Sequence, residues 1–298
     1  MREDFCAFIL THGRANNVKT YGELRANGYT GKIFIVIDDE DESGEEYKRI
    51  YGDDVLVFSK DEVAHYTDQF DNSSDRRTIL WARNVSWDLA RKMGYKFFIH
   101  LDDDYYYFGY RRMGKGHFNS NSSEEEYHLW KIRNLDAVFS AMVTLVENTP
   151  IDTIALSQGG EHQGGQPSKF RFKRKAMNSF VCDVEKPIRF RGRLNEDVNT
   201  YVGLGRIGRL FFTDMGIMLS QNDTQSSSGG TSEAYLASGT YVKAFYTVMI
   251  APSCTSITVP SSRVRSKTMG IRRIHHKVDW GKAVPLIIPQ EFKKAVNA

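Results

Sequence analysis

Short apolar runs alternate with amphipathic stretches along the first hundred residues of the chain. Four runs are apolar enough to form buried strands, and they lie at residues 5–10, 32–37, 54–58 and 96–101. A helix is expected to end near Ala26, and residues 76–93 place apolar side chains at helical spacing before Gly94, a typical helix stop. This alternation predicts an α/β fold with a mostly parallel, Rossmann-type sheet flanked by helices.

The pattern changes in the later part of the chain. A helix is expected from Glu124 to Val146, with the acidic residues 124–126 well placed at its N-terminal dipole. After Pro150 the sequence becomes strand-like and rich in loops, which include the Gly- and Ser-rich stretches 159–165 and 226–230. We therefore expect a mixed second half, and we find no internal repeat.

Three consecutive carboxylates follow the fourth apolar run. Asp102, Asp103 and Asp104 come directly after a predicted buried strand. Three negative charges so close together repel one another unless a cation lies between them. Hard divalent ions prefer such oxygen ligands, and ligands of α/β sheets bind at the carboxyl ends of strands. A solvated acidic turn is the alternative, but the position after a buried strand favours a metal site.

Polar residues also follow the other predicted strands. Taken one at a time, each is an ordinary loop charge, whereas together they predict a pocket for a nucleotide diphosphate with a metal. A glycine in this set allows a close approach, an arginine can meet a phosphate or base, and a carboxylate can accept hydrogen bonds from a ribose or nucleobase. The residues are Thr11, His12, Gly13 and Arg14 after the first strand, Asp38 at the second, and Arg83 and Asn84 on the helix before the carboxylates.

Composition limits the class of protein. The chain has 298 residues and 41% hydrophobic content, enough for a large buried core. No apolar run reaches the roughly 20 residues of a membrane span, and the N-terminal stretch resembles a first strand rather than a signal peptide. Three scattered cysteines, Cys6, Cys182 and Cys254, form neither a disulfide framework nor a zinc spacing. We therefore expect a cytoplasmic protein without a membrane partner.

The net charge of +3 hides an asymmetry between the two halves of the chain. Residues 1–149 hold 19 Lys and Arg against 26 Asp and Glu, whereas residues 150–298 hold 21 against 11. The basic second half predicts an anionic partner, although a solvated basic face with buried aromatic side chains is the alternative for any one cluster. Phe170, Phe172 and Phe190 lie among these clusters, where aromatic rings could stack on bases. The clusters are Lys169, Arg171, Lys173, Arg174 and Lys175, then Arg189, Arg191 and Arg193, then Arg263, Arg265, Lys267, Arg272, Arg273 and Lys277.

Two further polar pairs lie in the second half. Glu196 and Asp197 open a predicted helix, where a capping role is the alternative to a carboxylate that deprotonates a hydroxyl. His275 and His276 form either a surface pair or a late metal ligand. The segment 203–208 matches the glycine spacing of a dinucleotide-binding fingerprint, but a strand is expected after it where the motif needs a helix, so we reject it.

The ordered set of these motifs resembles a glycosyltransferase of the GT-A fold. The segments Thr11–Arg14, Phe97–Tyr105 and Asn195–Asn199 are similar, more narrowly, to the phage branch of the glycosyltransferases associated with TET/JBP oxygenases. That group includes the base J glucosyltransferases and the GREB1-like proteins. The resemblance implies one domain over residues 1–298, with a nucleotide-sugar half (1–149) and an acceptor half (150–298).

The resemblance also implies a reaction and roles for the candidate residues. A sugar would move from a nucleotide-sugar, with UDP as the expected nucleotide, to the hydroxyl of a 5-hydroxymethylpyrimidine in DNA. Asp102 and Asp104 would hold Mn²⁺ or Mg²⁺, completed by His275 or His276, and Asp103 would contact the donor. If the anomeric configuration is inverted, Asp197 would be the base.

Other functions stay open at the level of sequence. One is the same donor chemistry with a glycan, protein or small-molecule acceptor. Another is nucleotidyl transfer, which also uses carboxylates and a metal. A third is a non-catalytic nucleic-acid-binding protein with a degenerate pocket, against which the presence of Asp102, Asp104 and Asp197 argues.

Overall fold

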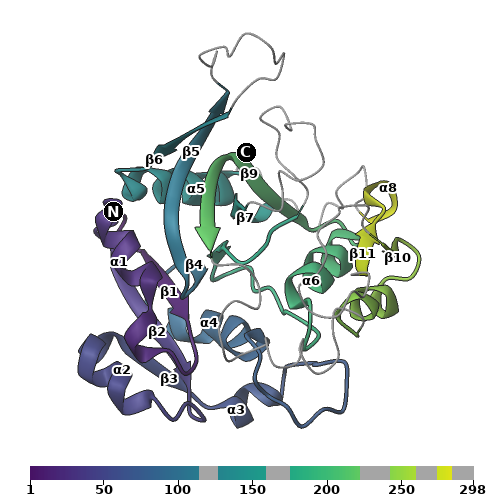
Figure 1. Ribbon diagram of the computed structural model, residues 1–298, viewed down its shortest axis with the longest axis horizontal. Helices are drawn as coiled ribbons and strands as arrows, with labels where there is room; N and C mark the ends of the chain where they lie inside the picture. Colours follow the sequence, from purple (N-terminus) through teal and green to yellow (C-terminus); the bar gives the residue numbers. More distant parts are fainter. Residues whose placement is uncertain (114–126, 159–174, 222–241, 260–273, 284–298) are drawn as a thin grey trace, which may run out of the picture.

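A mixed sheet forms the centre of the computed structural model, which describes residues 1–113, 127–158, 175–221, 242–259 and 274–283 (Figure 1). Nine strands of the described residues build it in the order β3-β2-β1-β4-β8-β7-β9-β5-β6. Their bounds are β1 Phe5–Leu10, β2 Lys32–Asp38, β3 Val55–Phe58, β4 Phe97–Asp102, β5 Tyr105–Met113, β6 Tyr127–Lys131, β7 Ile151–Ser157, β8 Phe180–Asp183 and β9 Leu210–Gln221.

The first four strands pair in parallel, as predicted from the alternation of strands and helices. β1 pairs with β2 and β4, and β2 pairs with β3, all in parallel. In this register Leu10 lies opposite Asp102 and Asp38 lies opposite Phe58, so these strands end at one edge of the sheet. From β8 onward most pairings are antiparallel, which confirms the expected α/β class with a mixed remainder.

Helices cover both faces of the sheet because β1 alternates its side chains between two cores. Phe5, Ala7 and Ile9 belong to the core to which α1, α2 and α5 contribute, whereas Cys6 and Phe8 belong to the core to which α3, α4, α6 and α8 contribute. The helices with assigned bounds are α1 Lys19–Ala26, α2 Gly44–Tyr51, α3 Lys60–Ala64, α4 Leu80–Lys92, α5 Leu135–Asn148, α6 Glu196–Gly205 and α8 Trp280–Ala283, with short 3-10 turns η1 Ala15–Asn17 and η2 Gly52–Asp54. Residues 242–250 are helical as well.

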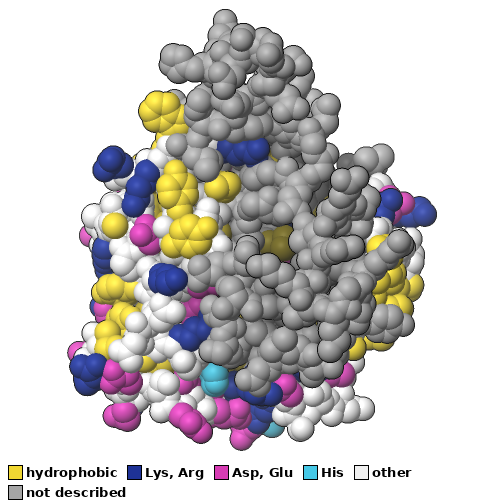
Figure 2. Space-filling model, in the orientation of Figure 1, with side chains coloured by type: hydrophobic (Ala, Val, Ile, Leu, Met, Phe, Trp, Pro, Cys, Tyr) yellow, Lys and Arg dark blue, Asp and Glu magenta, His cyan; other side chains and the backbone are white. Residues whose placement is uncertain are grey.

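A second sheet lies beside α6 and α8. β10, Thr255–Thr258, and β11, His275–Val278, pair antiparallel (Figure 1). None of the described helices is long and apolar enough to cross a membrane. Figure 2 shows acidic side chains gathered along the lower edge of one face, where Figure 1 places α2 and α3.

The helix predicted from Glu124 to Val146 is wrong in its first part. Residues 127–131 form β6, which pairs antiparallel with β5, and α5 begins only at Leu135. Asn134 is the N-cap, and its side chain accepts a hydrogen bond of 3.0 Å from the Ala137 amide. Pairing with β5, rather than local helical spacing, decides the conformation of this segment. The glutamates 124–126 and the two predicted loops at 159–165 and 226–230 lie outside the described residues.

Candidate active site at the carboxyl edge of the parallel strands

The three consecutive carboxylates lie where predicted, at the end of β4, and each has different surroundings. Asp103 is buried, and its two oxygens accept hydrogen bonds from Thr11 Oγ1 at 2.6 Å and Arg14 Nη1 at 2.9 Å. Thr11 and Arg14 follow β1, so the ends of these two neighbouring strands are joined. The pairing occupies Asp103, which leaves Asp102 and Asp104 as the carboxylates available to other groups.

Asp102 and Asp104 both have raised pKa values. The Asp102 side chain is 22% exposed, but its Oδ1 atom is buried and lies 3.6 Å from Arg83 Nη2. Burial raises the pKa of Asp102 to about 8, although Arg83 opposes the shift. Burial and the neighbouring Asp103 raise the pKa of the half-buried Asp104. A divalent cation would relieve this destabilisation of the ionised forms.

The backbone around the carboxylates is held by one threonine of α1. Thr20 Oγ1 donates a hydrogen bond of 2.6 Å to the Asp102 carbonyl and accepts one of 2.9 Å from the Tyr105 amide. Thr20 is fully buried, so water cannot replace these bonds. The triplet therefore lies on a rigid support, as precise placement of a metal or diphosphate requires.

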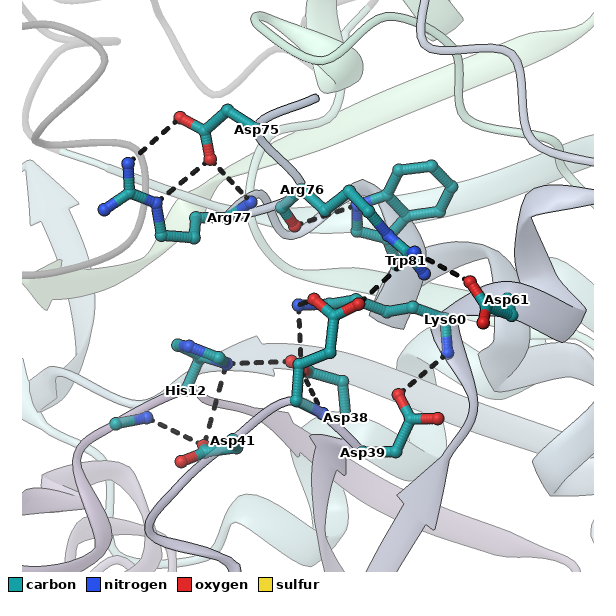
Figure 3. A network of polar contacts seen from close by, with 12 residues as sticks. His12, Asp38, Asp39, Asp41, Lys60, Asp61, Asp75, Arg76, Arg77 and Trp81 are labelled. Carbon is teal, nitrogen blue, oxygen red and sulfur yellow. Dashed lines mark hydrogen bonds and ion pairs between the residues drawn. The ribbon is translucent and has the colours of Figure 1, made fainter. Parts of the chain in front are cut away.

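A second network lies at the ends of β1 and β2 (Figure 3). His12 Nδ1 lies 2.8 Å from Asp38 Oδ2, and Lys60 Nζ lies 2.8 Å from Asp38 Oδ1. The hydrogen bond to Asp38 raises the pKa of His12 despite its partial burial. The Gly13 amide donates to Asp41 Oδ2 at 2.8 Å. A Cβ at Gly13 would meet no atom within 4 Å, so it is the left-handed backbone, with a φ of +68°, that favours glycine at this position.

Arg83 and Asn84 are both interior residues of α4. Arg83 Nε donates to Glu196 Oε1 at 3.1 Å, which connects α4 to the first turn of α6. Asn84 holds the backbone of Phe190, donating to its carbonyl at 3.0 Å and accepting from its amide at 2.8 Å. These contacts give Asn84 a structural role, and they place Glu196 on the same side of the sheet as Asp102.

The start of α6 is fixed by an unusual backbone conformation. Asn195, its N-cap residue, has a φ of +57°, and its side chain donates to the Lys243 carbonyl at 2.8 Å and lies 3.3 Å from His276 Nδ1. Glu196 and Asp197 follow in the first turn and are buried. Burial and the nearby Asp197 raise the pKa of Glu196 to about 6.

The predicted metal ligands are not all brought together. Among the described residues, no group of three or more His, Cys, Asp or Glu side chains is arranged to hold a metal ion, so His275 and His276 do not join Asp102 and Asp104 in one. Burial, His275 and two nearby lysines lower the pKa of His276 to about 3. Mg²⁺ usually binds through one or two carboxylates with substrate phosphates and water. The Oδ1 atom of Asp102 lies 3.6 Å from Arg83 Nη2 but has no hydrogen-bond partner among the described residues, so it fits that donor set.

The structure describes the basic clusters of the second half only in part. Residues 169–174 and 263–273 lie outside the described residues, and so do Phe170 and Phe172. In the middle cluster Arg193 pairs with Asp71 at 3.0 Å, and Arg189 donates to the Asn84 carbonyl at 3.1 Å. The expectation that Phe190 stacks on bases is wrong, because its ring is fully buried in the core.

Three residues of the site were missed by sequence reasoning. Tyr47 on α2 contacts Thr11 Oγ1 at 2.9 Å and the Arg14 amide at 2.8 Å, Lys60 neutralises Asp38, and Thr20 holds the Asp102 carbonyl. A polar residue shortly after a strand was a usable signal for Lys60, which follows β3. The other two lie within helices and carry no such signal.

The structure confirms the prediction that residues 203–208 do not form a dinucleotide-binding motif. α6 ends at Gly205, inside the glycine segment, and β9 begins at Leu210. No helix start follows the glycines to receive a pyrophosphate. The carboxylates after β4 are therefore the stronger candidate for a nucleotide diphosphate.

The family model for TET-Associated Glycosyltransferase matches residues 5–230, a range that contains the carboxylates after β4 and the start of α6. The chain belongs to this glycosyltransferase family. The match confirms the resemblance drawn from the motifs and makes the protein a glycosyltransferase enzyme.

Two solved structures share a distant similarity with this glycosyltransferase. A crystal structure of TarS from S. aureus aligns with 11% identity and a TM-score of 0.42, covering 74% of this chain and 37% of the TarS chain. A crystal structure of a mycobacterial protein aligns with 10% identity and a TM-score of 0.45, covering 92% of this chain and 83% of the other. No curated protein matches the chain. Neither structural similarity bears on the chemistry of the site.

Proposed function

We propose that the enzyme transfers a sugar from a nucleotide-sugar, with UDP as the expected nucleotide, to the hydroxymethyl group of a modified pyrimidine in DNA. The observation that carries the proposal is the set of carboxylates at the end of β4 in a chain of the TET-associated glycosyltransferase family. The basic second half of the chain supports an anionic acceptor, since phosphate neutralisation supplies most non-specific DNA affinity.

The donor would lie along the carboxyl edge of the parallel strands. Asp102 and Asp104 would hold Mn²⁺ or Mg²⁺ against the diphosphate, where the ion stabilises the negative charge of the leaving group. Arg14, whose side chain is 23% exposed beside Asp103, would contact the donor as well. The His12–Asp38 pair would meet the nucleoside, because both residues follow strands that end at this edge.

The acceptor hydroxyl would be deprotonated at the start of α6. Asp197 is our candidate base, because it is a buried carboxylate in the first turn of a helix whose position is fixed by Asn195. A base that acts on the attacking hydroxyl implies inversion at the anomeric carbon. Extrusion of the target base from the duplex would cost a few kcal/mol, offset by phosphate contacts.

The test is mass spectrometry of nucleosides from DNA incubated with the enzyme. DNA containing 5-hydroxymethyluracil or 5-hydroxymethylcytosine is incubated with a panel of nucleotide-sugars and Mn²⁺ or Mg²⁺. We expect a glycosylated nucleoside with the wild type, and a loss of at least about 100-fold in rate with Asp197→Asn. Unmodified DNA of the same sequence is the matched control.

Two results would overturn the proposal. Transfer to a glycan, protein or small molecule at rates that hydroxymethylated DNA does not reach would keep the donor chemistry and refute the acceptor. Release of pyrophosphate in place of a nucleoside diphosphate would indicate nucleotidyl transfer. The salt dependence of acceptor binding distinguishes DNA from these other acceptors independently. The affinity for DNA should fall about 1000-fold or more between 50 and 200 mM salt if the enzyme makes six or more phosphate contacts.

A further inference from the structure

Arg83 is a charged side chain enclosed in the interior of the enzyme. It lies on α4 and is 1% exposed, and its guanidinium packs 4.9 Å from the ring centre of Phe180 and 5.4 Å from that of Phe190. The sequence places Arg83 in the set of residues that together predict a pocket for a nucleotide diphosphate. A side chain this deeply enclosed by aromatic rings cannot reach a ligand without rearrangement of the core.

The guanidinium instead faces two carboxylates from distant parts of the chain. Its Nε lies 3.1 Å from Glu196 Oε1, and its Nη2 lies 3.6 Å from Asp102 Oδ1. Asp102 ends β4 and belongs to the candidate metal site, whereas Glu196 begins α6, beside the candidate base Asp197. One planar group therefore spans the elements that carry the two parts of the proposed reaction.

We propose that Arg83 is a positioning residue that sets the distance between the end of β4 and the start of α6, with Glu196 as its counter-ion. This inference rests on the proposed glycosyl transfer at the same site. It assigns Glu196 a role distinct from that of Asp197: Glu196 holds the arginine, and Asp197 deprotonates the acceptor.

The geometry explains why arginine is needed at this position. A guanidinium presents its N–H donors in a rigid plane, so Nε and Nη2 can address two different acceptors at once. A lysine ammonium is a point charge on a flexible stem and would approach one carboxylate at the expense of the other. The Nη1 atom of Arg83 has no hydrogen-bond partner among the described residues, so the polar contacts that position the group there are those with the two carboxylates, while the Phe180 and Phe190 rings pack against it.

The experiment measures kcat and KM for Arg83→Lys, Arg83→Met and Glu196→Gln. The readout is release of nucleoside diphosphate from the donor, with the acceptor that the wild type prefers, or with water if no acceptor is used. We expect kcat to fall about 100-fold for Arg83→Met and about 10-fold or more for Arg83→Lys, because misplacement by 1 Å can cost 100-fold. The KM for the donor should change less than about 3-fold, since Arg83 does not touch it.

Arg91 provides a matched control on the same helix. Its side chain is 55% exposed and pairs with Asp88 at 3.2 Å, so Arg91→Lys and Arg91→Met should leave both constants unchanged. If Arg83→Met does not fold, Glu196→Gln and the double variant Arg83→Met/Glu196→Gln still test the inference. The double variant should be more stable than Arg83→Met and no slower, because removal of both charges leaves fewer unpaired groups.

The size of the loss in kcat separates the two carboxylates at the start of α6. Asp197→Asn should lower kcat more than Glu196→Gln does, because only Asp197 is assigned the proton of the acceptor hydroxyl. A rise in donor KM with unchanged kcat in Arg83→Met would overturn the inference in favour of direct donor binding. Wild-type kcat in Glu196→Gln would also refute it, whereas inactivity on DNA with normal diphosphate release on another acceptor would refute only the proposed acceptor.

Discussion

Replacement of Lys60 by methionine tests the buried ion pair at the end of β2. Lys60 and Asp38 are 2% and 8% exposed, and their charged atoms lie 2.8 Å apart. Methionine fills a similar volume but leaves the Asp38 carboxylate without this cation. Loss of one partner of a buried pair costs about 3–5 kcal/mol of unfolding free energy, since the remaining charge stays buried.

The structure places the expected loss near the lower end of that range. Asp38 keeps a contact of 2.8 Å with His12 Nδ1 and a hydrogen bond of 3.1 Å from the Glu40 amide. We therefore expect Lys60→Met to lose about 3 kcal/mol, or about 1 M or more in the urea midpoint. Urea unfolding followed by tryptophan fluorescence measures this loss at equilibrium.

Lys48→Met is the matched control, because it removes an ion pair of the same length on the surface. Lys48 and Glu45 are also 2.8 Å apart, but they are 52% and 90% exposed. Exposed pairs contribute little to stability, so the control should unfold at the wild-type midpoint. Equal losses in Lys60→Met and Lys48→Met would refute the reasoning that burial sets the strength of the Lys60–Asp38 pair.

The loss of stability in Lys60→Met is expected to depend on pH through His12. The hydrogen bond to Asp38 raises the folded-state pKa of His12, so its stabilising contribution is complete below the unfolded value and is lost as the pH rises through the folded value. The protonated imidazole then partly replaces Lys60 at pH 5.5 but not at pH 8.5. The deficit of Lys60→Met should be larger at pH 8.5, and a deficit that is equal at both pH values would contradict this role of His12.

Three further predictions concern the fold and the metal. Gly28→Ala should lose at least about 2 kcal/mol, since Gly28 has a φ of +80° and a Cβ there would lie 2.3 Å from the Arg133 carbonyl oxygen; Gly94→Ala, with the same φ and open space, should lose less in the same urea assay. Thr20→Val should lose about 1–3 kcal/mol by leaving the Asp102 carbonyl and Tyr105 amide unpaired, and a wild-type midpoint would contradict this. EDTA should abolish sugar transfer, and Mn²⁺ or Mg²⁺ should restore it; activity that persists in EDTA would argue against the metal.

Local sequence patterns were sufficient for the parallel strands and for the residues that follow them. The apolar runs at β1, β2 and β4 are long enough to be buried on both faces, and such strands leave polar residues only at their ends. Because parallel strands end at one edge, the proximity of Thr11 and Arg14 to Asp103 could be expected before the fold was known. The error at residues 127–131 arose because strand pairing there overrides the helical spacing that continues into α5.

Local patterns in the sequence thus establish the α/β class and the location of three acidic residues at the carboxyl edge of a sheet. The tertiary structure alone decided how those residues differ: Asp103 is paired with Arg14, and Asp102 lies beside a buried Arg83. The contact between Arg83 and Glu196 joins residues 113 positions apart. Such contacts depend on strand order and on the packing of helices across a face, which the periodicity of a single segment does not encode.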